Sequence, residues 1–196
     1  MNKRDFCLLI VLAWTSSCST GTTVPADPAP VAQPDRHDAS FSAHGLTVER
    51  PADWQFISPV PDATVVPDTF VVMQGPAGHH TLAPAVEISH RTLQAADRRR
   101  NPEHVLQALV SEMVQILEGF ETTAGPEPAT VGGQPGARIF MFFTEGLPEG
   151  GSIERSARFY GVVNDEDVFI IRCIGPKDGS ADGVFDAIVS SISIAG

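Results

Sequence analysis

Residues 137–174 read ARIFMFFTEGLPEGGSIERSARFYGVVNDEDVFIIRCI and decide the fold of this chain. Three segments suited to strands alternate with two short breaks that are rich in glycine or acidic residues. The segments are residues 138–144, 153–163 and 168–174, and the breaks are residues 146–151 and 164–167. Breaks this short join neighbouring antiparallel strands as hairpins. The stretch therefore predicts three consecutive antiparallel strands.

The first and third of these strands are apolar on both of their alternating faces. In the first, Ile139, Met141 and Phe143 alternate with Phe140 and Phe142. A strand that is apolar on both faces must be covered on both faces. We therefore expect a central sheet with other elements packed above and below it.

On both sides of this stretch, the spacing of apolar residues predicts the remaining strands and helices. Strands are expected at residues 41–50, 54–57, 69–74 and 85–91, and a strand, a loop and a second strand at residues 120–136.

Two helices complete the predicted set. One begins at Asn101, a capping residue followed by Pro102 at the first helical position, and ends at Gly119. The other begins after Ser180, whose side chain we expect to cap it, and it presents one apolar face. Strands and helices in this order predict an α+β fold with a central antiparallel sheet.

The first 17 residues have the features of a signal peptide. Lys3 and Arg4 precede a short apolar run at residues 7–14, which is below the ~20 residues that span a bilayer. The segment resembles a bacterial lipoprotein signal, in which Cys18 becomes the lipidated first residue. It departs from that motif at Thr15, where the motif prefers Leu. The alternative is ordinary cleavage after Ser17 or a little later, without a lipid.

Residues 18–40 are expected to form a proline-rich tether behind Cys18, because repeated proline with small and polar residues cannot build a core. Residues 41–196 then form the folded domain. The net charge of −11 argues against nucleic acid as a partner, because an acidic protein repels phosphate. The three cysteines, Cys7, Cys18 and Cys173, fit neither a disulfide framework nor metal-ligand spacing.

Three stretches resemble the PsbP-like and DcrB-like superfamily, which includes lipoproteins of the LpqN type. They are GLTVERPADW at 45–54, VGGQPGA at 131–137 and FDAIVSS at 185–191. The resemblance covers nearly all of residues 41–196. It implies an α/β/α sandwich around an antiparallel sheet. It also implies a non-enzymatic role, because the superfamily contains assembly factors, secretion-effector chaperones and accessory lipoproteins and has no common catalytic residue set.

The sequence contains no nucleophile elbow, phosphate loop, zinc helix motif or dinucleotide fingerprint. We therefore expect no enzyme, no catalytic or metal site and no cofactor. His79, His80, His90 and His104 could converge on a metal, but adjacent histidines are poorly placed to chelate one ion. The glycine-rich residues 132–136 precede a strand, so they predict a turn and not a phosphate cradle.

Four further features are each assigned a structural role, with a functional alternative. Arg98 to Arg100 are interpreted as a solvated loop that could instead face anionic lipid or an acidic partner. Residues 164–167 carry oxygen ligands but fit a hairpin tip better than a calcium loop. Cys173 is expected to be a small buried hydrophobe, since a redox role would need exposure and a lowered pKa. Trp54 and Tyr160 are expected in the core, although they could line a ligand groove.

Together these features predict an exported, lipid-anchored, non-enzymatic accessory or binding protein of the bacterial cell envelope. It would be an outer-membrane lipoprotein facing the periplasm or the surface, with envelope proteins as partners. The alternative location is the periplasm or the exterior, as a secreted soluble protein. The alternative function is a carrier of a small apolar ligand or a metal ion in the periplasm. A third hypothesis is an envelope hydrolase, which would need nucleophile and base geometry in a cleft.

Overall fold

A computed structural model describes residues 34–36, 38–57, 68–77, 83–93, 101–116, 119–147 and 150–195. The predicted signal peptide, Cys18 and most of the tether lie outside these residues, as do His79, His80 and Arg98 to Arg100. No helix in the described part of the chain is long and apolar enough to cross a membrane.

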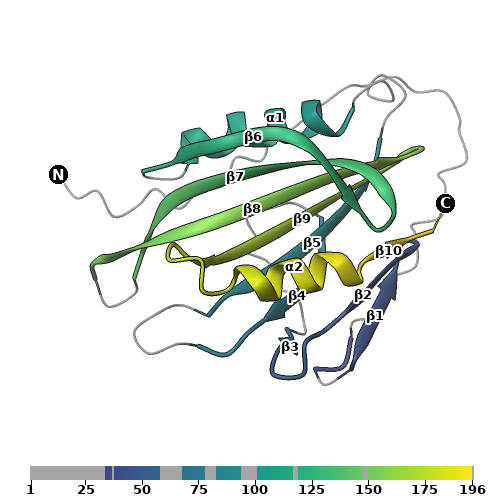
Figure 1. Ribbon diagram of the computed structural model, residues 1–196, viewed down its shortest axis with the longest axis horizontal. Helices are drawn as coiled ribbons and strands as arrows, with labels where there is room; N and C mark the ends of the chain where they lie inside the picture. The colour runs from purple at the N-terminus through teal and green to yellow at the C-terminus, as the bar shows by residue number, and fades with distance from the viewer. Residues whose placement is uncertain are drawn as a thin grey trace, which may run out of the picture. The chain divides into compact units, whose positions relative to one another are not determined.

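Seven antiparallel strands form the large sheet, in the order β3-β4-β5-β9-β8-β7-β6 (Figure 1). Their bounds are β3 Gln55–Phe56, β4 Thr69–Gln74, β5 Ala85–Thr92, β6 Glu121–Val131, β7 Gln134–Gly146, β8 Ser152–Asn164 and β9 Asp167–Pro176. The three strands predicted from residues 137–174 are confirmed as β7, β8 and β9. They pair as successive antiparallel neighbours, with Ile139 opposite Phe159 and Phe159 opposite Arg172.

A second, three-stranded sheet consists of β1 (Ser40–Ala43), β2 (Leu46–Glu49) and β10 (Ser193–Ile194). The single strand predicted at residues 41–50 is therefore wrong. The chain turns back at His44 and Gly45, which both have positive φ, 53° and 76°. Such a turn leaves the period-two alternation unbroken, so the pattern alone does not show it.

The edge strand β6 also differs from the prediction. Residues 120–136 do not form two strands around a loop, because β6 runs continuously from Glu121 to Val131 and β7 begins at Gln134. Pro126 and Pro128 lie inside β6, which is tolerated because the strand is at the edge of the sheet. The predicted glycine turn is confirmed: Gly132 and Gly133 have φ of 60° and 77° and join β6 to β7.

The two helices are α1 (Pro102–Ile116) and α2 (Asp182–Ser191). The predicted cap of α1 is confirmed, because the backbone N–H of His104 donates to Oδ1 of Asn101 at 2.9 Å. The predicted cap of α2 is wrong. Ala181 occupies the N-cap position and Ser180 lies one residue earlier, where its backbone N–H donates to Asp178 at 2.9 Å.

Two separate hydrophobic clusters lie on the two faces of the large sheet. One contains α1 and alternate residues of β7, β8 and β9, including Ile139, Phe159 and Ile170. The other contains α2, the small sheet and the intervening residues, including Phe169 and Ile171. In Figure 1, α2 lies in front of the large sheet and α1 lies behind β6. The two-sided burial predicted for the third strand is confirmed for β9, but the same prediction for the first strand is wrong, because Phe140 and Phe142 of β7 belong to neither cluster and are only half-buried.

The α+β fold around an antiparallel sheet is therefore confirmed. The finer prediction of an α/β/α sandwich is not confirmed, because α2 shares its layer with β1, β2 and β10.

Close approach of α1 to the sheet depends on Gly161 in β8. A Cβ atom at position 161 would lie 3.1 Å from Cγ of Leu106, which is completely buried. We predict that Leu106→Ala lowers the free energy of unfolding by about 2–5 kcal/mol, measured by denaturant titration. Val114→Ala is the matched control on the same helix, because Val114 is 55 % exposed and its truncation should change stability little. Equal effects of the two substitutions would contradict this packing.

Candidate functional site

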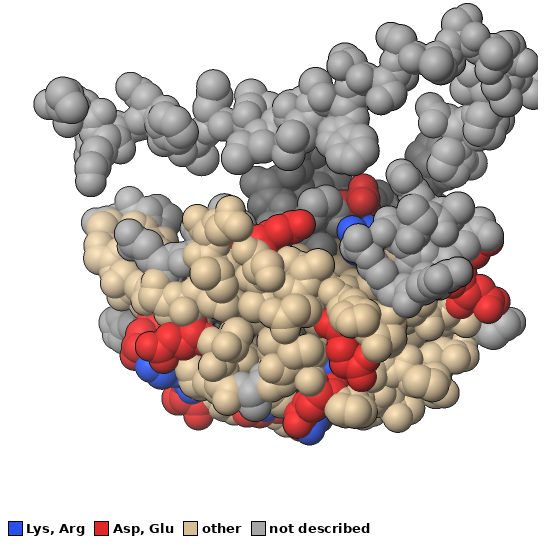
Figure 2. All heavy atoms as spheres, turned by 90° about the horizontal axis from the view of Figure 1, so that it is seen from above, with Lys and Arg blue, Asp and Glu red and all other residues tan. Residues whose placement is uncertain are grey.

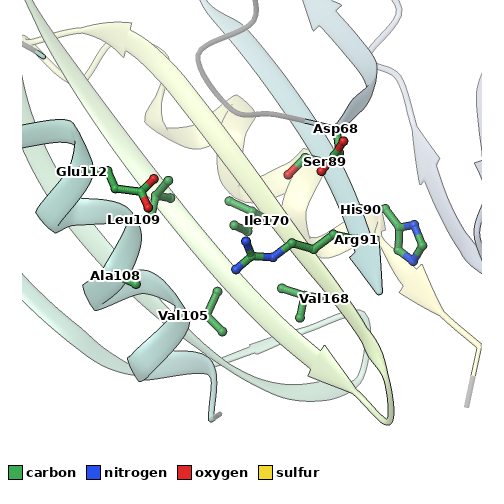
Figure 3. Close-up of a pocket in the computed structure, with 10 residues that line it drawn as sticks. All are labelled: Asp68, Ser89, His90, Arg91, Val105, Ala108, Leu109, Glu112, Val168 and Ile170. Carbon is green, nitrogen blue, oxygen red and sulfur yellow. The ribbon is translucent and has the colours of Figure 1, made fainter. Parts of the chain in front are cut away.

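A pocket of about 100 Å³ lies between α1 and the β5–β9 side of the sheet (Figure 3). Its apolar lining comes from both elements and consists of Val105, Ala108, Leu109, Val168 and Ile170. Its polar side chains are Asp68, which precedes β4, Ser89 and Arg91 on β5, and Glu112 on α1. The pocket therefore combines an apolar floor with charges of both signs.

Strand geometry explains the placement of the β5 side chains. Ser89 and Arg91 are two residues apart, so they project from the same face of β5, toward α1. Figure 3 shows Arg91 extending toward α1 and the Glu112 carboxylate projecting from α1 into the same space. Within the described residues, none of the four polar side chains makes a hydrogen bond or ion pair. Ser89 is nevertheless only 5 % exposed.

His90 also lies along this pocket, but its imidazole points to the opposite face of β5 (Figure 3). Its imidazole stacks on that of His44 with ring centroids 4.1 Å apart and planes at 19°, and its Nε2 lies 2.8 Å from Oδ1 of Asp167. Burial, and next the neighbouring His90, lower the pKa of His44, while Asp167 acts in the opposite sense.

The histidines do not meet as the metal hypothesis required. His104 lies on α1, on the other side of the sheet from the stacked pair, and His79 and His80 fall outside the described residues. Where side chains are described, no group of three or more His, Cys, Asp or Glu residues is placed to hold a metal ion. Sequence reasoning missed His44, because its contact with His90 depends on the turn between β1 and β2.

A buried charge cluster lies on the α1 face of the sheet. Glu87 and Arg172 are direct register partners on β5 and β9, and Nη2 of Arg172 donates to Oε1 of Glu87 at 2.7 Å. Arg155, only 3 % exposed, donates to the carbonyl of Ala83 at 3.2 Å and has its Nε 3.7 Å from Glu145. That last distance is an ion pair too long for a hydrogen bond, so Nε of Arg155 remains without a hydrogen-bond partner. Sequence reasoning did not identify this cluster.

Electrostatically, the cluster balances two guanidinium groups against two carboxylates. Burial lowers the pKa of both Arg155 and Arg172, and the glutamates oppose that effect. Because the charges cancel, we interpret the cluster as part of the folded framework and not as a ligand site.

The opposite face of β7 and β8 carries an aromatic–cation surface, defined by Phe140, Phe142, Arg138, Arg158 and Lys177. The guanidinium carbons of Arg138 and Arg158 lie 5.2 and 5.3 Å from the Phe140 ring centroid, and Nζ of Lys177 lies 5.3 Å from that of Phe142. A hollow of about 160 Å³ lies among these side chains and the start of α2. The two phenylalanine rings are half-buried, so part of each ring faces the solvent.

The sequence matches no protein-family model and no curated protein. Solved structures do match the fold. The cyanobacterial PsbP protein of Synechocystis sp. PCC 6803 aligns with a TM-score of 0.51 and 12 % identity, over 89 % of this chain and 98 % of its own. The chain has a PsbP-like fold. At 12 % identity this likeness concerns the fold alone. The fold is the one that the resemblance in the sequence implied.

Two further solved structures align with this chain. A crystal structure from Bacteroides thetaiotaomicron VPI-5482 aligns with a TM-score of 0.51 and 13 % identity over 82 % of this chain. The chain spans about half the length of that protein, 49 %. LpqN of Mycobacterium tuberculosis, involved in cell envelope biogenesis, aligns with a TM-score of 0.48 and 17 % identity over 77 % of this chain and 83 % of its own. That score is too low to support the fold assignment, which rests on the PsbP structure.

The other residues singled out in the sequence lie in the hydrophobic core or in a hairpin turn. Trp54 and Tyr160 are buried in the α2-side cluster, and Trp54 meets Phe185 edge-on with ring centroids 6.2 Å apart. Cys173 is fully buried in the same cluster, which raises the pKa of its thiol. Residues 164–167 form the tip of the β8–β9 hairpin, where Asp165 has a φ of 52°.

The buried pair of Glu87 and Arg172 generates a stability prediction. Glu87→Gln keeps the side-chain shape but leaves the Arg172 charge uncompensated, so we expect the free energy of unfolding to fall by about 3–5 kcal/mol. Glu127→Gln is the matched control, because it breaks the exposed pair with Arg138 and should cost about 0–1 kcal/mol. Denaturant titration of both variants measures the difference, and a small loss for Glu87→Gln would show that the pair is dispensable.

The stacked histidines generate a prediction about pH. The folded chain holds the pKa of His44 below its ordinary value of 6.5, so the unfolded chain binds more protons as the pH falls through that value. The free energy of unfolding should therefore decrease as the solution is acidified below about 6.5.

His44→Asn should remove part of this decrease, since asparagine does not titrate and tolerates a positive φ. Denaturant unfolding at a series of pH values measures the slope. His104→Asn, at an exposed position of α1, should keep the wild-type slope. If His44→Asn also kept it, the stacked pair would not be the source of the pH dependence.

Proposed function

We propose that this protein is a non-enzymatic accessory or binding protein of the bacterial cell envelope, held at a membrane by a lipid on Cys18 and acting through contacts with envelope proteins. The observation that carries the proposal is the aromatic–cation surface. Partly exposed aromatic rings with arginine beside them are the residue types that dominate protein–protein interfaces. Figure 1 shows α2 lying over β4, β5 and β9, away from β7, whose Phe140 and Phe142 are only half-buried.

Ion pairs surround this surface with charged side chains, as is typical of the polar rim of a protein–protein interface. Arg138 pairs with Glu127 at 2.6 Å, Arg158 with Asp186 at 2.8 Å and Lys177 with Glu154 at 2.5 Å. These pairs hold the cations over the two rings, so the aromatic contacts are preorganised before a partner arrives. A preorganised surface loses less side-chain entropy when it binds.

The geometry of β5 supports a non-catalytic role. Ser89 and His90 are sequence neighbours, but they project to opposite faces of the strand (Figure 3), so they do not form a nucleophile–base pair. Cys173 has a raised pKa and is fully buried, which disfavours a reactive thiolate. The PsbP-like fold, for which the sequence resemblance implies no shared catalytic set, agrees with this role.

The acidic surface favours protein partners over nucleic acid. On the face drawn in Figure 2, more acidic than basic side chains are visible. A polyanion would be repelled by such a surface and would gain little from counterion release. The position at a membrane rests on residues 1–18 of the sequence, in particular on Cys18.

The alternative of an apolar-ligand carrier is less well supported. The pocket beside α1 holds about 100 Å³, below the roughly 300–1,000 Å³ of sites that enclose larger ligands. A hollow of about 450 Å³ beside Gly75 is wider, but it opens to the surface and its lining includes Asp53, Gln55 and Gln74. Neither offers a mostly apolar enclosure.

Co-purification from the native envelope tests the proposal. The full chain is compared with Cys18→Ala, with the double variant Phe140→Ala/Phe142→Ala, and with Val114→Ala as an exposed apolar control on α1. We expect specific envelope proteins to be recovered with the full chain and with the control. Recovery should fall about fivefold or more for the double variant, as expected for loss of interface anchors.

The Cys18→Ala variant should lose both its membrane association and the lipid seen by intact mass. Equal recovery with all variants, or turnover of a substrate by the purified chain, would overturn the proposal.

A further inference from the structure

The turn between β1 and β2 attaches the small sheet to the large one. His44 occupies that turn, and its imidazole stacks on that of His90 in β5, with ring centroids 4.1 Å apart and ring planes at 19°. The His44 ring also meets Phe70 of β4 edge-on, with 5.1 Å between the centroids. A titratable side chain of the small sheet therefore lies directly on a titratable side chain of the large sheet.

A single carboxylate balances this pair of imidazoles. Oδ1 of Asp167, at the start of β9, lies 2.8 Å from Nε2 of His90. Asp68, just before β4, offers His90 its backbone carbonyl, which accepts the N–H of His90 at 3.2 Å. Within the described residues, the charged groups that act on His44 are His90 and Asp167, and their effects oppose each other. The pair therefore has a counter-charge for one proton but not for two.

The other contacts of the turn do not titrate. The backbone N–H of Ala195, just after β10, donates to the carbonyl of Gly45 at 2.9 Å. Nδ2 of Asn164 in turn donates to the carbonyl of Ala195 at 2.8 Å, which ties the turn to the β8–β9 hairpin. These bonds persist whatever the protonation of the histidines. The stack is thus the part of the attachment that acid can change.

Protonation of the two histidines affects the stack in opposite ways. A carboxylate only accepts hydrogen bonds, so a proton on His90 leaves Nε2 donating to Asp167 and adds charge to that bond. A further proton on His44 places two imidazolium rings at a separation of 4.1 Å, where like charges repel. His44 is exposed to solvent, so it can relieve the repulsion by leaving the stack.

We propose that His44, His90 and Asp167 form an acid-sensitive latch between the two sheets. At neutral pH the stacked rings hold the β1–β2 turn on β4 and β5. When both histidines are protonated, His44 leaves the stack, the turn becomes mobile and the ring of Phe70 gains solvent exposure. The latch shares no residue with the aromatic–cation surface, so the inference does not depend on the proposed protein contacts.

Titration of the histidine side chains by NMR, on the purified full chain, tests the coupling between the two rings. The pKa of His44 should lie below the ordinary 6.5 in the wild type. It should rise in His90→Gln, which keeps a donor for Asp167 but does not titrate, because the repulsion is removed. It should fall further in Asp167→Asn, because the counter-charge is removed.

Hydrogen exchange at about pH 7.5 and about pH 5, corrected for the intrinsic exchange rates, tests the release of the turn. We expect residues 42–47 to lose protection about fivefold or more at the lower pH, relative to residues 157–162 of β8. His44→Asn, which tolerates a positive φ, and His90→Gln should each remove this pH-dependent difference. His104→Asn, at an exposed position of α1, should keep it.

Two results would overturn the latch. One is an equal loss of protection in residues 42–47 and 157–162, which would show that acid only lowers the stability of the whole chain. The other is a His44 pKa that neither His90→Gln nor Asp167→Asn changes. Circular dichroism checks that each variant is folded, and if one is not, the comparison of the two segments in the wild type still decides the proposal.

Discussion

Two-sided burial of β8 and β9 is the constraint on which the rest of the structure depends. Alternate residues of these strands enter two different hydrophobic clusters, so each face needs its own cover. On one face α1 provides it, and on the other α2 and the small sheet provide it together. Because α1 covers only part of its face, the pocket opens between the helix and β5. On the other face α2 and the small sheet cover β9 and part of β8 but not β7, which leaves the aromatic–cation surface partly exposed.

The same arrangement explains where charge is tolerated. Arg172 and Glu87 replace apolar residues on the α1 face, where the register of β5 and β9 makes them partners. Buried charges require such pairing, since a lone charge in that position would lose its hydration without compensation. Ser89 and Arg91 continue the same row of β5 side chains, and the row ends at the surface, where Arg91 is exposed to solvent and needs no partner within the protein.

Local sequence signals predicted the local structure well. The alternation in residues 137–174 identified the meander, and Asn101 with Pro102 identified the start of α1. Failures occurred where a local pattern was ambiguous: the turn at His44 preserves the alternation, and Pro126 and Pro128 hid the edge strand β6. The candidate sites were not predictable, because they depend on contacts between distant residues. Glu87 and Arg172 are 85 positions apart, and the pocket combines residues from Asp68 to Ile170.

The central claim is that the aromatic–cation surface contacts other envelope proteins. The most direct test places a photo-crosslinking amino acid at Phe142 in one sample and at Val114 in another, in the full chain within its native envelope. Phe142 lies on the aromatic–cation surface, whereas Val114 is an exposed apolar residue of α1. The account predicts discrete crosslinked protein adducts from position 142 and none from position 114. Adducts from position 114 alone, or none from either position, would contradict it.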